Sequence, residues 1–123
     1  GLDVTHRALF LEPDVARLET LGTRIGRVWV DLLRFFAIYH RKRYGWDGSP
    51  IHDAVAVAHL AMPGLVTTRH LRVDVETAGE LTRGRTVADR EGLRRLPANV
   101  EAGVDIDRAR FVDMLVDAIA SFG

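Results

Sequence analysis

Residues 49–60, SPIHDAVAVAHL, place a histidine and an aspartate directly before a run of small apolar residues with the length of a buried helix. An aspartate at a helix start commonly caps the first backbone N–H groups, so Asp53 is a candidate N-cap. The small side chains that follow allow close packing, and we expect this helix start to lie inside the protein. There, His52 can donate a proton near neutral pH and Asp53 can offer hard oxygen to a cation. The spacing alone favours a capping role at this helix start. A buried helix start instead favours a role of His52 and Asp53 in proton transfer and metal binding.

The longest predicted helix lies just upstream, from Thr23 to about Tyr44. Its charged residues recur at helical period and form one narrow polar stripe, which consists of Arg24, Arg27, Asp31, Arg34 and Arg41. Its other side chains are mostly apolar and cover more of the circumference than an outer helix of a small domain needs to bury. We therefore expect this helix to have neighbours on nearly all sides.

Helix and strand patterns alternate along the rest of the chain. The further predicted elements are a strand at 2–4, a helix at 15–22, a helix at 54–62, strands at 71–76, 86–89 and 100–106, and a helix at 108–121. Asp107 is the expected N-cap of the last helix, and Ile106 with Phe111 form a hydrophobic staple. The order of elements predicts an α/β protein with a small β-hairpin.

Composition limits the class of protein. The 123 residues are 47% hydrophobic and 28% charged, which predicts one globular segment, 1–123. Seventeen basic residues balance seventeen acidic ones, so no net field draws the chain to nucleic acid or an anionic membrane. No apolar run has the length of a membrane span, and the absence of cysteine excludes thiolate metal sites. We expect a cytoplasmic protein that binds neither nucleic acid nor membrane.

Three other motifs have structural explanations. The basic run HRKRY at 40–44 complements the macrodipole at a helix C-terminus. The pair of aspartates in DID at 105–107 lies at a strand-to-helix junction, where capping explains it. The stretch RGRT at 83–86 lacks the strand–loop–helix order that phosphate-binding loops require. These motifs predict no separate site.

Three stretches resemble, in this order, the C-terminal part of the inosine-uridine-preferring nucleoside hydrolases. They are GLDVTH at 1–6, YGWDGSPIHDAVAVAHL at 44–60 and VDVETAGELTRGRTVAD at 73–89. The resemblance spans essentially the whole chain. It implies an α/β fold with a mixed, largely parallel sheet flanked by helices, and hydrolysis of the N-glycosidic bond of ribonucleosides to base and ribose.

The resemblance also implies roles for individual residues. Asp53 would be one calcium ligand, and His52 would be the acid that protonates the departing base. The long upstream helix would line the base pocket, with His40 and Tyr44 at the matching positions. Ala54 stands where the family usually has proline, and the D-x-D-x-x-x-D-D motif that supplies most calcium ligands is absent from the 123 residues.

The sequence therefore predicts the C-terminal portion of a nucleoside hydrolase, inactive alone, whose complete form acts on a ribonucleoside. We expect this segment to bind calcium weakly or not at all. We also expect a homo-oligomer, formed through apolar surfaces and an exposed strand edge at 1–5. A non-catalytic α/β interaction module or a degenerate truncated homologue is the alternative, and the choice between purine and pyrimidine stays open.

Overall fold

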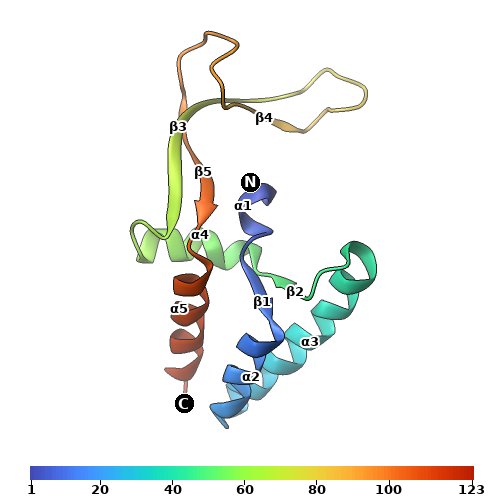
Figure 1. The fold of residues 1–123 in the computed structure, drawn as a ribbon, viewed down its shortest axis with the longest axis vertical. Helices are drawn as coiled ribbons and strands as arrows, with labels where there is room; N and C mark the ends of the chain where they lie inside the picture. The colour runs from blue at the N-terminus through green and yellow to red at the C-terminus, as the bar shows by residue number, and fades with distance from the viewer. The chain divides into compact units, whose positions relative to one another are not determined.

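The computed structural model describes residues 1–123 and contains five helices and five strands (Figure 1). Their order is α1 (Leu2–Thr5), β1 (Leu9–Leu11), α2 (Glu12–Thr20), α3 (Arg24–Tyr44), β2 (Gly48–Pro50), α4 (His52–Ala61), β3 (Val66–Val75), β4 (Thr86–Asp89), β5 (Val100–Ile106) and α5 (Arg108–Ala120). The chain divides into two compact units, residues 1–66 with 105–123 and residues 67–104. No helix combines the length and the apolarity that a membrane crossing requires.

The first unit has two apolar clusters that share helix α5. One cluster joins β1 and helices α2, α3 and α5 through Phe10, Val15, Leu18, Val30, Leu33, Val112, Val116 and Ile119. The other joins α1, α4 and α5 through Val4, Ala8, Val55, Ala58, Leu65, Ile106 and Phe111. Both members of the predicted hydrophobic staple, Ile106 and Phe111, lie in the second cluster, which holds α4 and so positions the residues at its start.

A short two-stranded sheet leads the chain into α4. Strands β1 and β2 pair antiparallel, with Leu9 opposite Pro50. The buried hydroxyl of Ser49 donates a hydrogen bond of 3.1 Å to the carbonyl of Leu33, which ties β2 to α3. Asp14 and Arg108 form an ion pair that joins the starts of α2 and α5. These contacts fix the direction from which the backbone enters α4.

Local capping explains the bounds of the longest and the last helix. Thr23 caps α3 by accepting a hydrogen bond of 2.9 Å from the N–H of Gly26, and Gly45 ends the helix in the left-handed region at φ 70°. Asp107 caps α5 by accepting a bond of 3.1 Å from the N–H of Arg110. The sequence-based predictions of both helices, and of Asp107 as N-cap, are confirmed.

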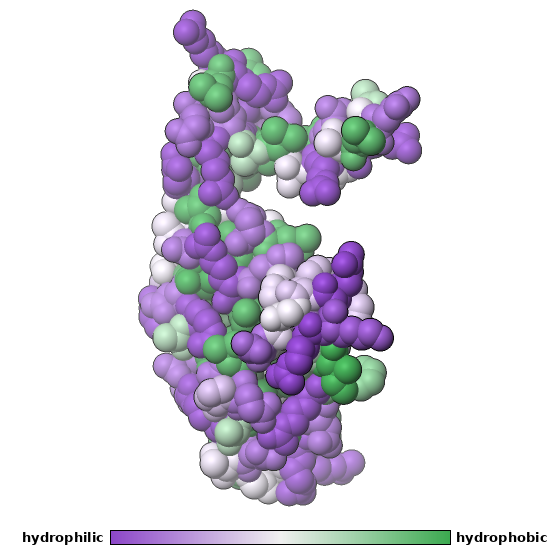
Figure 2. Space-filling model, turned by 45° about the vertical axis from the view of Figure 1, so that its right-hand side comes forward, coloured by the Kyte–Doolittle hydropathy of each residue, from purple (hydrophilic) through white to green (hydrophobic).

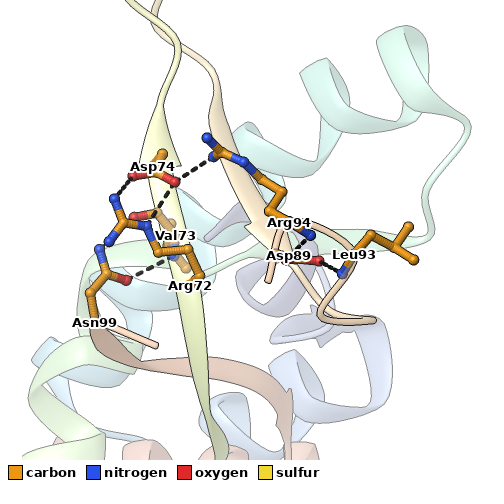
Figure 3. A network of polar contacts seen from close by, with 7 residues as sticks. All are labelled: Arg72, Val73, Asp74, Asp89, Leu93, Arg94 and Asn99. Carbon is orange, nitrogen blue, oxygen red and sulfur yellow. Dashed lines mark hydrogen bonds and ion pairs between the residues drawn. The ribbon is translucent and has the colours of Figure 1, made fainter. Parts of the chain in front are cut away.

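The second unit is built on a sheet with the strand order β4-β3-β5. Strands β3 and β4 form the predicted antiparallel hairpin, with Val73 opposite Ala88. Asp74 accepts hydrogen bonds of 2.6 Å from both Arg72 and Arg94, and the bond from Arg72 is the main cause that lowers the pKa of the Asp74 carboxyl (Figure 3). The loop that carries Arg94 is thereby joined to β3.

Two further side chains organise this loop. The Asn99 amide bonds both backbone groups of Val73, at 2.8 Å to the N–H and 2.9 Å to the carbonyl, as a neighbouring strand would (Figure 3). The carboxylate of Asp89 accepts bonds of 2.9 Å from the N–H groups of Leu93 and Arg94. These contacts satisfy backbone groups of an otherwise exposed segment.

The predicted strand at 2–4 is wrong, because these residues form one turn of helix. The N–H groups of Val4 and Thr5 both donate to the carbonyl of Gly1. Leu2 is 62% exposed and Val4 is 3% exposed. Positions two apart lie on nearly opposite sides of a helix as well as of a strand. A pattern of three residues therefore cannot distinguish a helix from a strand. The strand edge expected at 1–5 as a pairing surface is therefore absent.

The start of α4 also differs from its prediction. His52 is the first helical residue, and Ile51 occupies the N-cap position without a side-chain hydrogen bond. Asp53 lies inside the first turn and is not the N-cap. The α/β class is confirmed, but the pairs β1–β2 and β3–β4 are antiparallel, whereas the resemblance implied a largely parallel sheet. The turn at 76–85 connects β3 directly to β4, and so short a connection allows only antiparallel pairing.

Within these 123 residues helix α3 packs mainly along one side, so the chain does not itself provide the neighbours expected on the other sides. Its main contacts within the chain are with α2, β2 and α5. The opposite side presents apolar residues at alternating spacings of three and four, all between 38% and 73% exposed, namely Ile25, Val28, Leu32, Phe35 and Tyr39. We call these five residues the α3 apolar face. Figure 2 shows apolar side chains reaching the surface among hydrophilic ones.

Candidate functional site

The start of α4 places His52 against the first helix of the chain. The Nδ1 atom of His52 lies 2.7 Å from the hydroxyl oxygen of Thr5, the last residue of α1. Both side chains are partly buried. Because His52 begins a helix, it lies at the positive end of the helix dipole, where a neutral imidazole and an anionic carboxylate are favoured.

Aromatic rings form a continuous cluster around His52. The centroid of the His6 ring is 5.5 Å from that of His52 and 4.7 Å from that of Trp46. Trp46 stacks on Tyr44, with centroids 4.7 Å apart, and is nearly parallel to His40 at 5.9 Å and 4°. The five rings thus connect the end of α3, the turn before β2 and the start of α4.

The end of α3 explains how three of these rings come together. His40 and Tyr44 are one helical turn apart on the same side of the helix, and their rings stack at 6.0 Å. Gly45 has φ 70°, a conformation that favours glycine, and it ends the helix directly before Trp46. His40 is only 5% exposed, and its Nδ1–H donates a bond of 3.0 Å to the carbonyl of Phe36. Since a carbonyl only accepts, the hydrogen of neutral His40 lies on Nδ1.

The surroundings of His52 lower the pKa of its imidazole below the usual value. Burial is the largest cause, followed by the charges that His6 and His40 carry when protonated, whereas the carboxylate of Asp53 acts in the opposite direction. The folded chain therefore binds this proton less tightly than the unfolded chain. The contribution of His52 to stability therefore falls as the pH drops through the ordinary histidine value near 6.5, because the unfolded state takes up the proton more readily.

Asp53 does not form a calcium site with other residues of this chain. Its side chain is exposed in the first turn of α4. Calcium binds about 6–8 oxygen ligands. No group of three or more histidine, cysteine, aspartate or glutamate side chains is arranged to hold a metal ion.

The structure brings together all four residues that the sequence analysis singled out. His40, Tyr44 and His52 belong to one ring cluster, and Asp53 follows His52 in α4. Their chemical roles stay predictions. Sequence reasoning missed two rings of the cluster, His6 and Trp46, and also Thr5, which contacts His52. All three lie in the stretches GLDVTH and YGWDGSP, but no spacing rule places Thr5 and His6 beside a helix start so distant in the sequence.

Comparisons with known proteins agree with the resemblance found in the sequence. The model of the family described as inosine-uridine preferring nucleoside hydrolase matches residues 1–113. The pyrimidine-specific ribonucleoside hydrolase RihA of Shewanella woodyi is 42% identical over 123 residues, which cover 99% of this chain and 39% of that protein. RihA of Enterobacter sp. strain 638 is also 42% identical, with the same coverage. The chain thus spans about two-fifths of the length of these relatives.

Two solved structures share the fold. The purine-preferring ribonucleoside hydrolase from Gardnerella vaginalis is 30% identical and superimposes with a TM-score of 0.79 over 98% of this chain and 38% of that one. The plant nucleoside hydrolase PpNRh1 is 23% identical, has a TM-score of 0.82 and covers 98% of this chain and 40% of that one. At 23% identity, the likeness to PpNRh1 shows a shared fold alone.

Proposed function

The chain belongs to the inosine-uridine preferring nucleoside hydrolases, and from this membership we propose that it is part of an enzyme that cleaves ribonucleosides to free base and ribose. The bond broken is the N-glycosidic bond. Because the chain spans 39% of the length of its curated relatives, the activity is proposed for a protein that also contains the part of those relatives outside the match. Alone, the chain is expected to be inactive.

One observation carries this proposal, namely the position of His52 at the start of α4 beside a cluster of rings. Departure of a nucleobase leaves negative charge on a ring nitrogen, which a positioned acid neutralises by giving it a proton. His52 is the proposed acid. The lowered pKa of His52 makes its protonated form a stronger proton donor. The carboxylate of Asp53 acts in the opposite direction on this pKa and so keeps more of His52 protonated. His40 and Tyr44, together with Trp46, offer aromatic faces to a planar base.

Asp53 is proposed as one ligand of a calcium ion whose other ligands lie outside this chain. Bound calcium supplies positive charge that orients hydroxyl groups and acidifies a bound water. The names of the relatives give different base preferences, because RihA is called pyrimidine-specific and the Gardnerella vaginalis enzyme is called purine-preferring. We therefore propose ribonucleosides as the substrate class without choosing a base. The cytoplasmic location stays a prediction.

A fusion protein tests the proposed function. The part of Shewanella woodyi RihA that lies outside the match is joined to Gly1 of this chain, and base release from uridine, cytidine and inosine is followed by ultraviolet absorbance. We expect hydrolysis by the fusion protein in the presence of calcium and none by the chain alone. A folded fusion protein that binds calcium but hydrolyses none of the three would contradict the proposal.

The α3 apolar face supports a second candidate function, in which the chain serves as an interaction module. Alternating spacings of three and four place its five residues on one line, as in helices that pack side by side. An exposed apolar surface of this kind usually marks an interface. We propose that the isolated chain forms homo-oligomers by pairing this face with that of a second copy.

Substitution of Leu32 by aspartate is expected to weaken this self-association at least about tenfold. Leu32 lies at the centre of the α3 apolar face and is 58% exposed, so a charge there stays hydrated in the monomer but loses water at an interface. Sedimentation velocity over a range of protein concentrations gives the dissociation constant of each variant.

The matched control is Leu81→Asp, because Leu81 is 95% exposed in the second unit. This variant should associate as the unchanged chain does. A monomeric unchanged chain at every concentration, or equal weakening in both variants, would refute the pairing through α3.

A further inference from the structure

Thr5 is the hydrogen-bond partner of the His52 ring. The contact joins Nδ1 of His52 to the hydroxyl oxygen of Thr5 at 2.7 Å and spans 47 positions of the sequence. It therefore exists only because α1 packs beside the start of α4. The contact leaves Nε2 as the ring nitrogen without a hydrogen-bond partner in the chain.

The surroundings hold Thr5 in place. Val4, its neighbour in α1, is 3% exposed and lies in the apolar cluster with Val55 and Ala58 of α4. After α1, the carbonyl of Ala8 accepts a bond of 3.1 Å from the N–H of Ile51, directly before His52. Thr5 is also β-branched, so its side chain has few rotamers. Core packing on one side and a backbone bond on the other fix the distance between the two side chains.

We propose that Thr5 is a positioning residue for His52, and this proposal rests on the function proposed above. In neutral His52, Nδ1–H donates to the Thr5 oxygen and Nε2 carries the lone pair. Nε2 takes a proton from solvent and later gives it to the departing base nitrogen. One N–H bond breaks on His52, one forms on the base, and the bond from Nδ1–H to Thr5 is the same before and after.

The opposite arrangement has a different consequence. If the Thr5 hydroxyl donated to Nδ1, the hydrogen of neutral His52 would lie on Nε2. Further protonation would then occur at Nδ1, the nitrogen that lies against Thr5. The two arrangements differ in which nitrogen of neutral His52 carries hydrogen, and this can be measured without substrate. Neither neighbouring histidine selects between them, because His6 meets His52 through a T-shaped ring contact and His40 makes its hydrogen bond to the carbonyl of Phe36.

Nitrogen-15 spectra of the histidine rings test the proposal in the 123-residue chain. Spectra of the unchanged chain, Thr5→Ser and Thr5→Val are recorded at one pH, near 8, where histidine is neutral. We expect hydrogen on Nδ1 of His52 in the unchanged chain and in Thr5→Ser, which keeps the hydroxyl. In Thr5→Val, which keeps the shape but not the hydroxyl, we expect the hydrogen to shift toward Nε2. Backbone amide shifts away from the site report whether the fold is kept.

Hydrogen on Nε2 in the unchanged chain would overturn the proposal, as would an unaltered His52 in Thr5→Val. In the fusion protein, Thr5→Val should lower kcat about tenfold, as expected for the loss of one hydrogen bond, with little change in KM and recovery in Thr5→Ser. An inactive fusion protein would contradict the proposed function but leave the spectra to decide on Thr5. Spectra with hydrogen on Nε2, together with an active fusion protein, would rule out the positioning role of Thr5 and leave the proposed function in place.

Discussion

Replacement of His52 by alanine in the fusion protein is expected to lower kcat about 100-fold or more while calcium affinity stays nearly the same. A positioned general acid contributes about 10²–10⁴ in rate, and His52 is the proposed acid. Replacement of Asp53 by alanine is expected to lower calcium affinity and kcat together, because the carboxylate is a proposed ligand. Steady-state kinetics at several calcium concentrations and isothermal titration with calcium measure the two effects.

The controls use the same substitutions at residues that do not belong to the ring cluster. His70→Ala removes an exposed histidine of the second unit, and Asp117→Ala removes an exposed aspartate of α5. Both variants should retain kcat and calcium affinity. Equal loss of calcium affinity in His52→Ala and Asp53→Ala would show that the two residues do not have separate roles, and an unchanged kcat in His52→Ala would exclude it as the acid.

Replacement of Phe111 by alanine is expected to lower the free energy of unfolding by about 3–5 kcal/mol. Phe111 is fully buried in the cluster that joins α1, α4 and α5, and it packs with Val55, Ala58 and Leu65 there. Loss of its ring removes buried apolar surface and leaves a cavity that the short helices can close only in part. The loss is a large share of the roughly 5–15 kcal/mol that stabilises a typical domain.

Urea denaturation followed by circular dichroism measures this change. Phe122→Ala is the matched control, because Phe122 is 74% exposed and its replacement should change the free energy of unfolding by no more than about 0.5 kcal/mol. A similar small change for Phe111→Ala would mean that the cluster under α4 does not stabilise the fold.

The sequence by itself determined most helices and strands, because their signals are local. Thr23 and Gly45 bound α3, Asp107 caps α5, and alternating side chains mark β5. Each of these features depends on neighbours within a few positions, where side-chain periodicity and capping act. The same is true of the pair His52 and Asp53, which the sequence could single out because the two residues stand together before an apolar run.

Tertiary structure alone decided the nature of α1 and the composition of the ring cluster. The stretch at 2–4 is too short for its periodicity to separate helix from strand, so packing of Val4 on α4 settles it. Thr5 reaches His52 across 47 positions. Contacts at such separations depend on how whole elements pack, which no spacing within one element records. The exposed face of α3 follows from the same cause, since only the packed chain shows which of its apolar residues find partners.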